Sequence, residues 1–169
     1  MCLLGIALMA ACNPETIQKR DFATEVLRSE KGRKIRGIEL GKTMEAARQL
    51  ETAELVSSSD SSLVFREDVS YRGRKVELEL HYNFDQYGLF EVQIDVFPAS
   101  MSDAEKCFLA LKRKLTLMYG SPKPMGQGWR YTTFSLTNNI VEVSLHNESR
   151  DAGKPFVSIN FLEPLDDEL

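Results

Sequence analysis

The residues best able to do chemistry in this chain include its two histidines. His81 and His146 each follow a polar residue at a spacing of two, Glu79 and Ser144 respectively. On a strand that spacing places both side chains on one face, so a shared surface metal site is one interpretation. Strong metal sites use three or four ligands, whereas this pattern supplies only two histidines as strong ligands. Solvated polar side chains are therefore the favoured interpretation, and we predict neither a metal nor a cofactor.

A second group is acidic. Glu77, Glu79, Glu91 and Asp95 could supply the carboxylate pair of a glycosidase. They alternate with apolar residues, however, which is typical of the solvated face of a strand. The sequence contains no Gly-x-Ser-x-Gly elbow, His-Glu-x-x-His pair, paired-cysteine zinc motif or phosphate-binding glycine loop. The chain is therefore predicted to bind a partner rather than to catalyse a reaction.

The N-terminal region carries the clearest motif. Residues 3–11 are uncharged and apolar, too few to cross a bilayer, which takes about 20 residues in a helix. They match the apolar region of a secretory signal. The stretch 8–12, Leu-Met-Ala-Ala-Cys, resembles a bacterial lipobox. The resemblance implies a signal peptide over 1–11, acylation of Cys12, and a place on the periplasmic side of the outer membrane. A buried N-terminal element with a core cysteine, or a plain cleaved signal, are the alternatives.

Residues 12–36 are predicted to be a lipid-anchored tether and basic segment. Residues 19–36 include seven basic and three acidic residues, a composition that fits either a solvated terminus or contact with anionic lipid headgroups. The whole chain has 169 residues and a net charge of −4, which fits one domain and does not favour nucleic acid as a partner. After processing, Cys107 is the remaining thiol, and it is predicted to be an inert core residue.

The rest of the chain, 37–169, is predicted to be a single domain. Thr43 is a plausible helix N-cap, and Ser102 to Glu105 forms a capping box before a helix that runs to about residue 118. Residues 57–62 are predicted to be a loop. Alternation of apolar and polar residues predicts strands over 63–69, 75–82, 89–97, 129–134, 140–146 and 155–162.

The order of these elements suggests an internal repeat. Residues 76–81 match residues 141–146 at an offset of 65, which aligns the two histidines and places Leu50 on Leu115. We call residues 37–98 the first half and 99–162 the second half. The repeat predicts an α+β fold, a six-stranded antiparallel sheet with two helices on one face. The other face, here called the open face, would bind the partner and would carry Glu77, Glu79, His81, Glu91, Gln93, Asp95, Glu142, Ser144 and His146.

Helix plus three antiparallel strands, in tandem, resembles the β-lactamase-inhibitor-protein-like architecture. Residues 37–46, Gly-Ile-Glu-Leu-Gly-Lys-Thr-Met-Glu-Ala, are similar to the helix entry of outer-membrane lipoproteins of the BamE type. The resemblance implies a protein partner in the cell envelope, as a binding or assembly module. The alternatives are an inhibitor of a periplasmic or secreted hydrolase, using loop 121–127 or 146–154, and a small envelope enzyme that uses the acidic face.

Overall fold

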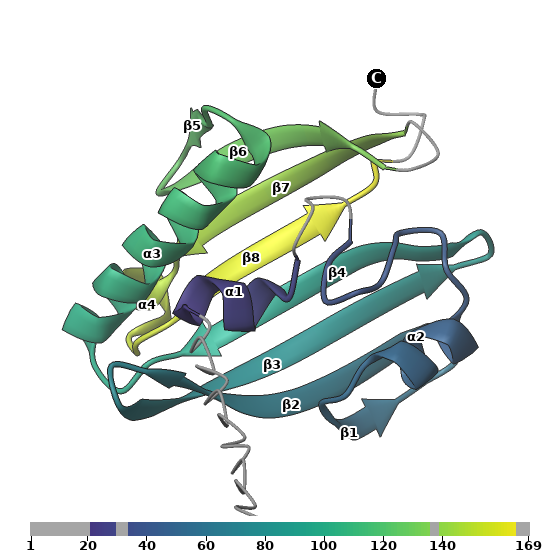
Figure 1. Ribbon diagram of the computed structural model, residues 1–169, viewed down its shortest axis with the longest axis horizontal. Helices are drawn as coiled ribbons and strands as arrows, with labels where there is room; N and C mark the ends of the chain where they lie inside the picture. The colour runs from purple at the N-terminus through teal and green to yellow at the C-terminus, as the bar shows by residue number, and fades with distance from the viewer. Residues whose placement is uncertain (1–20, 30–33, 136–138, 165–169) are drawn as a thin grey trace, which may run out of the picture.

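The computed structural model describes residues 21–29, 34–135 and 139–164 (Figure 1). Residues 1–20, with the predicted signal peptide and Cys12, lie outside them. The fold is α+β, as predicted, with one antiparallel sheet in the order β1-β2-β3-β4-β8-β7-β6-β5. The strands are β1 (Glu54–Ser58), β2 (Ser62–Tyr71), β3 (Arg74–Asp85), β4 (Gly88–Phe97), β5 (Lys123–Met125), β6 (Gly128–Phe134), β7 (Ile140–Asn147) and β8 (Val157–Leu162). The helices of the described residues are α1 (Phe22–Leu27), α2 (Met44–Leu50), α3 (Met101–Tyr119) and α4 (Ser149–Ala152).

Alternation of apolar residues forms the central strands. In β3 every second side chain is buried, and the polar residues between them point to the opposite face. The same pattern repeats in β7 and β8. The core therefore lies on one face of the sheet, and its inward-facing β3 and β7 side chains are Val76, Leu78, Leu80, Tyr82, Val141, Val143 and Leu145.

The two halves meet where β4 pairs with β8. Ile94 lies opposite Ile159, and these two residues are 65 positions apart. Leu80 pairs with Ile94 just as Leu145 pairs with Ile159, so the offset also holds between β3–β4 and β7–β8. The strands of the two halves thus share one register across the middle of the sheet.

The sheet has eight strands where six were predicted. The two additional strands, β1 and β5, form its outer edges and are short. All five residues of β1 are exposed, and its pairing with β2 shifts between Leu55 and Ser57. An exposed strand lacks the apolar alternation that marks a half-buried one, which is why the predicted loop 57–62 overlaps the last two residues of β1.

The helices that cover the sheet differ from the predicted pair. α3 contacts β6, β7 and β8, and α1 contacts β2 and α3. Figure 1 shows α1 and α3 side by side over the sheet, with α2 beside the β1 edge. α2 is seven residues long and buries Ala47 alone. The alignment of Leu50 with Leu115 is therefore wrong in packing terms, because Leu50 is 50% exposed and Leu115 is fully buried.

The N-terminal segment joins the core earlier than the predicted boundary at residue 37. Val26 and Leu27 of α1 are fully buried, and Ile35 and Ile38, which form a β-bridge, are nearly so. Asp21 caps α1 through a hydrogen bond from the Thr24 backbone amide at 3.0 Å. The described part of the predicted tether is thus part of the folded domain.

Glycines dock the segment before α2 onto β4. A Cβ atom at Gly88 would lie 2.5 Å from the Gly41 carbonyl oxygen, so the two backbones approach too closely for a side chain there. The Gly41 amide donates a hydrogen bond to the Leu89 carbonyl at 2.7 Å, and the Leu89 amide donates one to the Lys42 carbonyl at 2.9 Å. Gly41 and Gly88 both have positive φ, which favours glycine.

The start of α3 also differs from the prediction. Ser100, not Ser102, is the N-cap, and its hydroxyl accepts a hydrogen bond from the Asp103 amide at 3.1 Å. Ser102 lies within the first turn. Both serines are followed three residues later by an acidic residue, so the sequence offered two registers for the same motif. Gly120 ends the helix with a positive φ of 85°.

Candidate functional site

The structure places all nine predicted open-face residues on the side of the sheet away from the core. Each alternates with a buried neighbour, and Glu79 lies opposite Asp95 while His81 lies opposite Gln93. Eight of the nine are half-buried, and Asp95 is 7% exposed. The structure adds further polar residues that the sequence prediction omitted, namely Arg66, Asn83, Arg130, Ser158 and Asn160.

The centre of the open face is a set of carboxylates bound by neighbouring amides and hydroxyls. Asp95 accepts hydrogen bonds from the Gln93 amide at 3.0 Å and the Ser158 hydroxyl at 2.9 Å. Glu91 accepts from Asn83 at 2.6 Å and from Asn160 at 2.7 Å. These bonds join β3, β4 and β8, so side chains from both halves fix one another in place. Groups held this way lose little rotamer entropy on binding a ligand.

His81 lies between Asp95 of this set and a further carboxylate, that of Glu79. Its Nε2 is 3.0 Å from Glu79 Oε1 and 3.7 Å from Asp95 Oδ2. Glu79 also accepts from Arg66 at 2.9 Å, and that hydrogen bond lowers the pKa of the Glu79 carboxyl against the opposing effect of burial. A general acid in a glycosidase needs a raised pKa instead. Glu79 is therefore set up for ionic contact rather than for proton donation.

The two histidines do not come together. His81 is on β3 and His146 is on β7, with β4 and β8 between them. Three strand spacings correspond to about 14 Å, too far for one metal ion. Within the described residues, no three histidine, cysteine or acidic side chains are grouped so as to hold a metal ion.

Each half of the open face carries one arginine–glutamate pair at a corresponding place. Arg66 on β2 approaches Glu77 at 3.6 Å, and Arg130 on β6 approaches Glu142 at 3.5 Å. Glu77 and Glu142 are 65 positions apart, like the histidines. The halves differ elsewhere, because the places of Glu79 and Asp95 correspond to Ser144 and Asn160.

A buried ionic cluster lies on the core side, and the sequence analysis missed it. The Arg36 guanidinium contacts Glu51 at 2.7 and 3.0 Å, Glu67 at 2.6 Å, and the Val26 carbonyl at 3.0 Å. The Tyr82 hydroxyl donates to Glu51 at 2.6 Å. The cluster thus ties the N-terminal segment, the end of α2, β2 and β3 to one another.

The protonation states of this cluster are fixed by its contacts. Burial alone would raise the pKa of the Glu51 carboxyl, but hydrogen bonds and charge from Arg36 lower it to about 2. Burial raises the pKa of Tyr82 well above its ordinary value, and the neighbouring Glu51 charge adds to this. Arg36 itself stays cationic, because Glu51 and Glu67 outweigh the effect of burial on its pKa. The cluster is a structural cross-link, formed by residues between 15 and 46 positions apart, which no local motif reveals.

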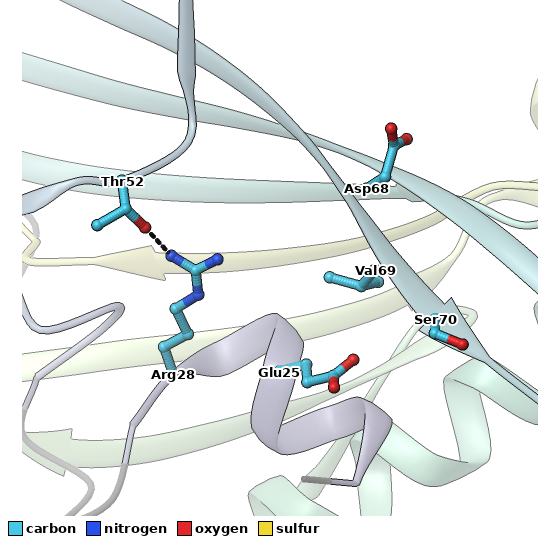
Figure 2. A pocket seen from close by; sticks show the side chains of 6 residues that line it. All are labelled: Glu25, Arg28, Thr52, Asp68, Val69 and Ser70. Carbon is cyan, nitrogen blue, oxygen red and sulfur yellow. Dashed lines mark hydrogen bonds between the residues drawn. The ribbon is translucent and has the colours of Figure 1, made fainter. Parts of the chain in front are cut away.

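A polar pocket opens beside this cluster, between α1 and β2. Its volume is about 530 Å³, and its lining residues are Glu25, Arg28, Thr52, Asp68, Val69 and Ser70. Figure 2 shows the Arg28 side chain turned toward Thr52, to which it donates a hydrogen bond. Arg28 also contacts Glu51 and Glu67, and Asp68 pairs with Lys75 at 2.7 Å. Arg28 and Asp68 of the pocket lining are therefore engaged in ion pairs within the protein. The lining residues include neither a histidine nor a cysteine that could act as a nucleophile or base.

The two predicted inhibitory loops are partly ordered elements. Segment 121–127 contains β5 and its turn to β6. Segment 146–154 contains α4, where Ser149 is buried and its hydroxyl exchanges hydrogen bonds with the Phe156 backbone at 3.0 and 2.9 Å. The second segment is thus held to the start of β8.

Cys107 lies in the core, as the sequence predicts. It is fully buried in α3, and burial raises the pKa of its thiol to about 12. It therefore stays protonated and unreactive near neutral pH. In the part of the chain that the structure describes, the helices are too short or too polar to cross a membrane.

Comparison of the chain with models of protein families, with curated proteins and with solved structures returned no match.

Proposed function

We propose that the chain is an exported, lipid-anchored envelope protein whose open face binds a partner protein. The observation that carries this proposal is the hydrogen-bonded set of Asp95, Glu91, Gln93, Ser158 and Asn160 at the middle of that face. Polar groups held on rigid strands are preorganised for recognition, and such sites are more exact than sites on loops. The partner surface would extend from β3 across β4 and β8 to β7.

The anchor in this proposal is Cys12, within the lipobox-like stretch 8–12. Acylation there would hold the protein at the periplasmic side of the outer membrane. The folded domain begins by Asp21, so eight residues, 13–20, join it to the anchor. In the described part of the predicted basic segment, Arg28 and Arg36 pair with Glu51 and Glu67 within the domain.

We further propose that the domain is a tandem duplication of the β-lactamase-inhibitor-protein-like kind. Its support is the common register, in which the pairs of β3 with β4 and of β7 with β8 coincide at an offset of 65. The mirrored strand order, β1-β2-β3-β4 followed by β8-β7-β6-β5, agrees with two units related by a pseudo-twofold axis. The helices have diverged most, since α2 and α3 differ in length and in packing.

The test has two parts. Intact mass spectrometry of protein purified from its own membranes should show a chain that begins at an acylated Cys12, and Cys12→Ala should abolish this form. An unprocessed, unacylated chain would contradict the anchor.

Crosslinking followed by capture from detergent-solubilised envelopes then tests the surface. Ser144→Trp places a bulky side chain on the open face without removing a hydrogen bond between described residues, and it should abolish recovery of the partner. Leu50→Trp on α2 is the matched control and should not. Equal recovery with both variants would contradict binding by the open face. Recovery of a single hydrolase would favour an inhibitor over an assembly module. Enzymatic turnover that is lost in Glu79→Gln would contradict both of these binding functions.

A further inference from the structure

Charge is distributed unevenly along the chain in a way that the motifs do not explain. Between residues 106 and 141 there are six basic residues and no acidic one, although the whole chain has a net charge of −4. Lys106, Lys112, Arg113 and Lys114 of this stretch lie on α3. These four basic residues outnumber the two acidic residues of α3, Asp103 and Glu105, and α3 lies on the opposite side of the sheet from the carboxylates of the open face. Arg130, at the edge of the second half, lies on the open face instead, where it pairs with Glu142.

The outward surface of α3 combines these cations with exposed leucines. Leu109 is 52% exposed and Leu117 is 77% exposed, and Arg113 lies one turn from each of them. The opposite side of the helix buries Cys107, Leu111 and Leu115 in the core. Isolated exposed leucines are ordinary, but leucines interleaved with basic residues on a helix are typical of surfaces that lie on a membrane.

Two further cations border this surface. Lys112 Nζ lies 3.4 Å from the centre of the Trp129 ring. Lys114 Nζ is 3.0 Å from the Thr24 hydroxyl of α1. Both contacts are made by the ammonium groups themselves, with neutral partners, so the two positive charges are held at the border of the α3 surface. Neither lysine forms a salt bridge with a carboxylate among the described residues.

The chain also brings this surface close to the proposed anchor. The Lys114–Thr24 contact places the beginning of the described chain next to α3. Eight residues separate Asp21 from Cys12, which makes nine steps along the chain, and an extended chain covers about 3.3–3.6 Å per step, so α1 begins within about 30 Å of an acylated Cys12. A weak attraction of α3 for the same membrane would act at high effective concentration.

We infer that the outward surface of α3, formed by Lys106, Leu109, Arg113 and Leu117, lies on anionic lipid headgroups. This inference rests on the proposed lipid anchor. It orients the domain, because the open face is on the other side of the sheet and turns away from the membrane toward its partner. Basic residues near an anionic membrane surface attract its lipids, and the attraction falls off within a Debye length.

The experiment uses the acylated protein in vesicles that contain anionic phosphatidylglycerol and nitroxide-labelled headgroups. Leu117→Cys introduces a thiol for a fluorescent label on α3. Tyr87→Cys is the matched control, because Tyr87 is 78% exposed and lies in the turn between β3 and β4, at the other end of the sheet in Figure 1. Cys107 should stay unlabelled, since it is buried and its pKa is about 12.

The label at residue 117 should be quenched and the label at residue 87 should not. Adding Arg113→Glu should reduce the fraction of quenched molecules at least about fivefold, as expected for loss of one or more basic contacts with the surface. Raising the salt to about 1 M, where the Debye length is near 3 Å, should do the same. Equal quenching at both sites, equal quenching in purely zwitterionic vesicles, or protection of residue 117 by a bound protein would overturn the inference. A chain that is never acylated would be missing from the vesicles before labelling, which identifies failure of the proposed anchor itself.

Discussion

The two halves of the sheet share a strand register but are covered in different ways. In the second half one helix of 19 residues, α3, packs its apolar side on β6, β7 and β8. In the first half α2 is short, and the cover is completed by α1 and by the buried cluster around Arg36. Strands that share one register therefore do not require matching helices, since the same apolar face can be covered by separate short segments. These separate segments depend on buried ion pairs, and each buried charge needs its partners to remain in place if the domain is to stay stable.

The strongest test of this difference removes the centre of the cluster. Arg36→Leu leaves the Glu51 carboxylate buried without its main partner, so we expect the free energy of unfolding to fall by about 3–5 kcal/mol. Denaturant unfolding followed by circular dichroism measures the loss.

The control for this variant is Asn147 in the second half, at the position that corresponds to Tyr82 of the cluster. Tyr82, which donates a hydrogen bond to Glu51, pairs with Val92, and Asn147 pairs with Val157 at an offset of 65. Asn147 hydrogen-bonds Glu105 at the surface, so Asn147→Ala should cost about 1 kcal/mol or less. Similar losses in the two variants would contradict the claim that the first half alone depends on a buried polar cluster.

A second test compares the two helices directly. Leu115→Ala removes a fully buried side chain from under α3 and should destabilise the domain by about 2–5 kcal/mol. Leu50, at the position that the predicted repeat aligns with Leu115, is half-exposed, so Leu50→Ala should change stability by no more than about 0.5 kcal/mol. Thermal and urea unfolding of both variants would measure this. A large effect at Leu50 would mean that α2 packs as α3 does.

Acid should affect the first half selectively. The pKa of Glu51 in the folded protein is about 2, below the ordinary value of 4.5, so the unfolded chain binds a proton more readily. This contribution is complete above about pH 4.5 and is lost as the pH falls toward 2. Between pH 6 and pH 3 it should amount to about 2 kcal/mol. Urea unfolding at the two pH values measures it as the difference between the wild type and Glu51→Gln, which should lose less stability on acidification. Equal pH dependence in the two proteins would show that Glu51 does not carry it.

Local patterns predicted the strands better than the helices. The alternation in β3, β7 and β8 was read correctly because each strand buries one face, and Ser100 was missed as a cap because Ser102 offered the same motif two residues later. β1 could not be recognised because all its residues are exposed. The open-face residues were predicted from the same alternation. The cluster around Arg36 was not, because its members are brought together only by the tertiary fold.

The open face shows what the halves have in common and where they differ. Both carry a histidine and an arginine–glutamate pair at corresponding places, while the carboxylates at Glu79 and Asp95 have the neutral counterparts Ser144 and Asn160. The shared groups fit the common register of the strands. The carboxylates make the first half the more acidic part of the open face, so a partner with a basic surface should contact that half more closely.

The shared arginine–glutamate pairs should matter least for stability. Arg66 and Arg130 are each nearly half-exposed, and exposed ion pairs contribute little because solvent screens them and ordering the side chains costs entropy. Arg66→Ala and Arg130→Ala should therefore leave the melting temperature nearly unchanged, and by similar amounts. Differential scanning calorimetry at low and high salt measures both. A marked drop for Arg66→Ala alone would show that its contact with Glu79 ties the carboxylate set of the first half into the fold, which would give this half of the face a structural role. Matching small effects would leave the pairs free to act in recognition.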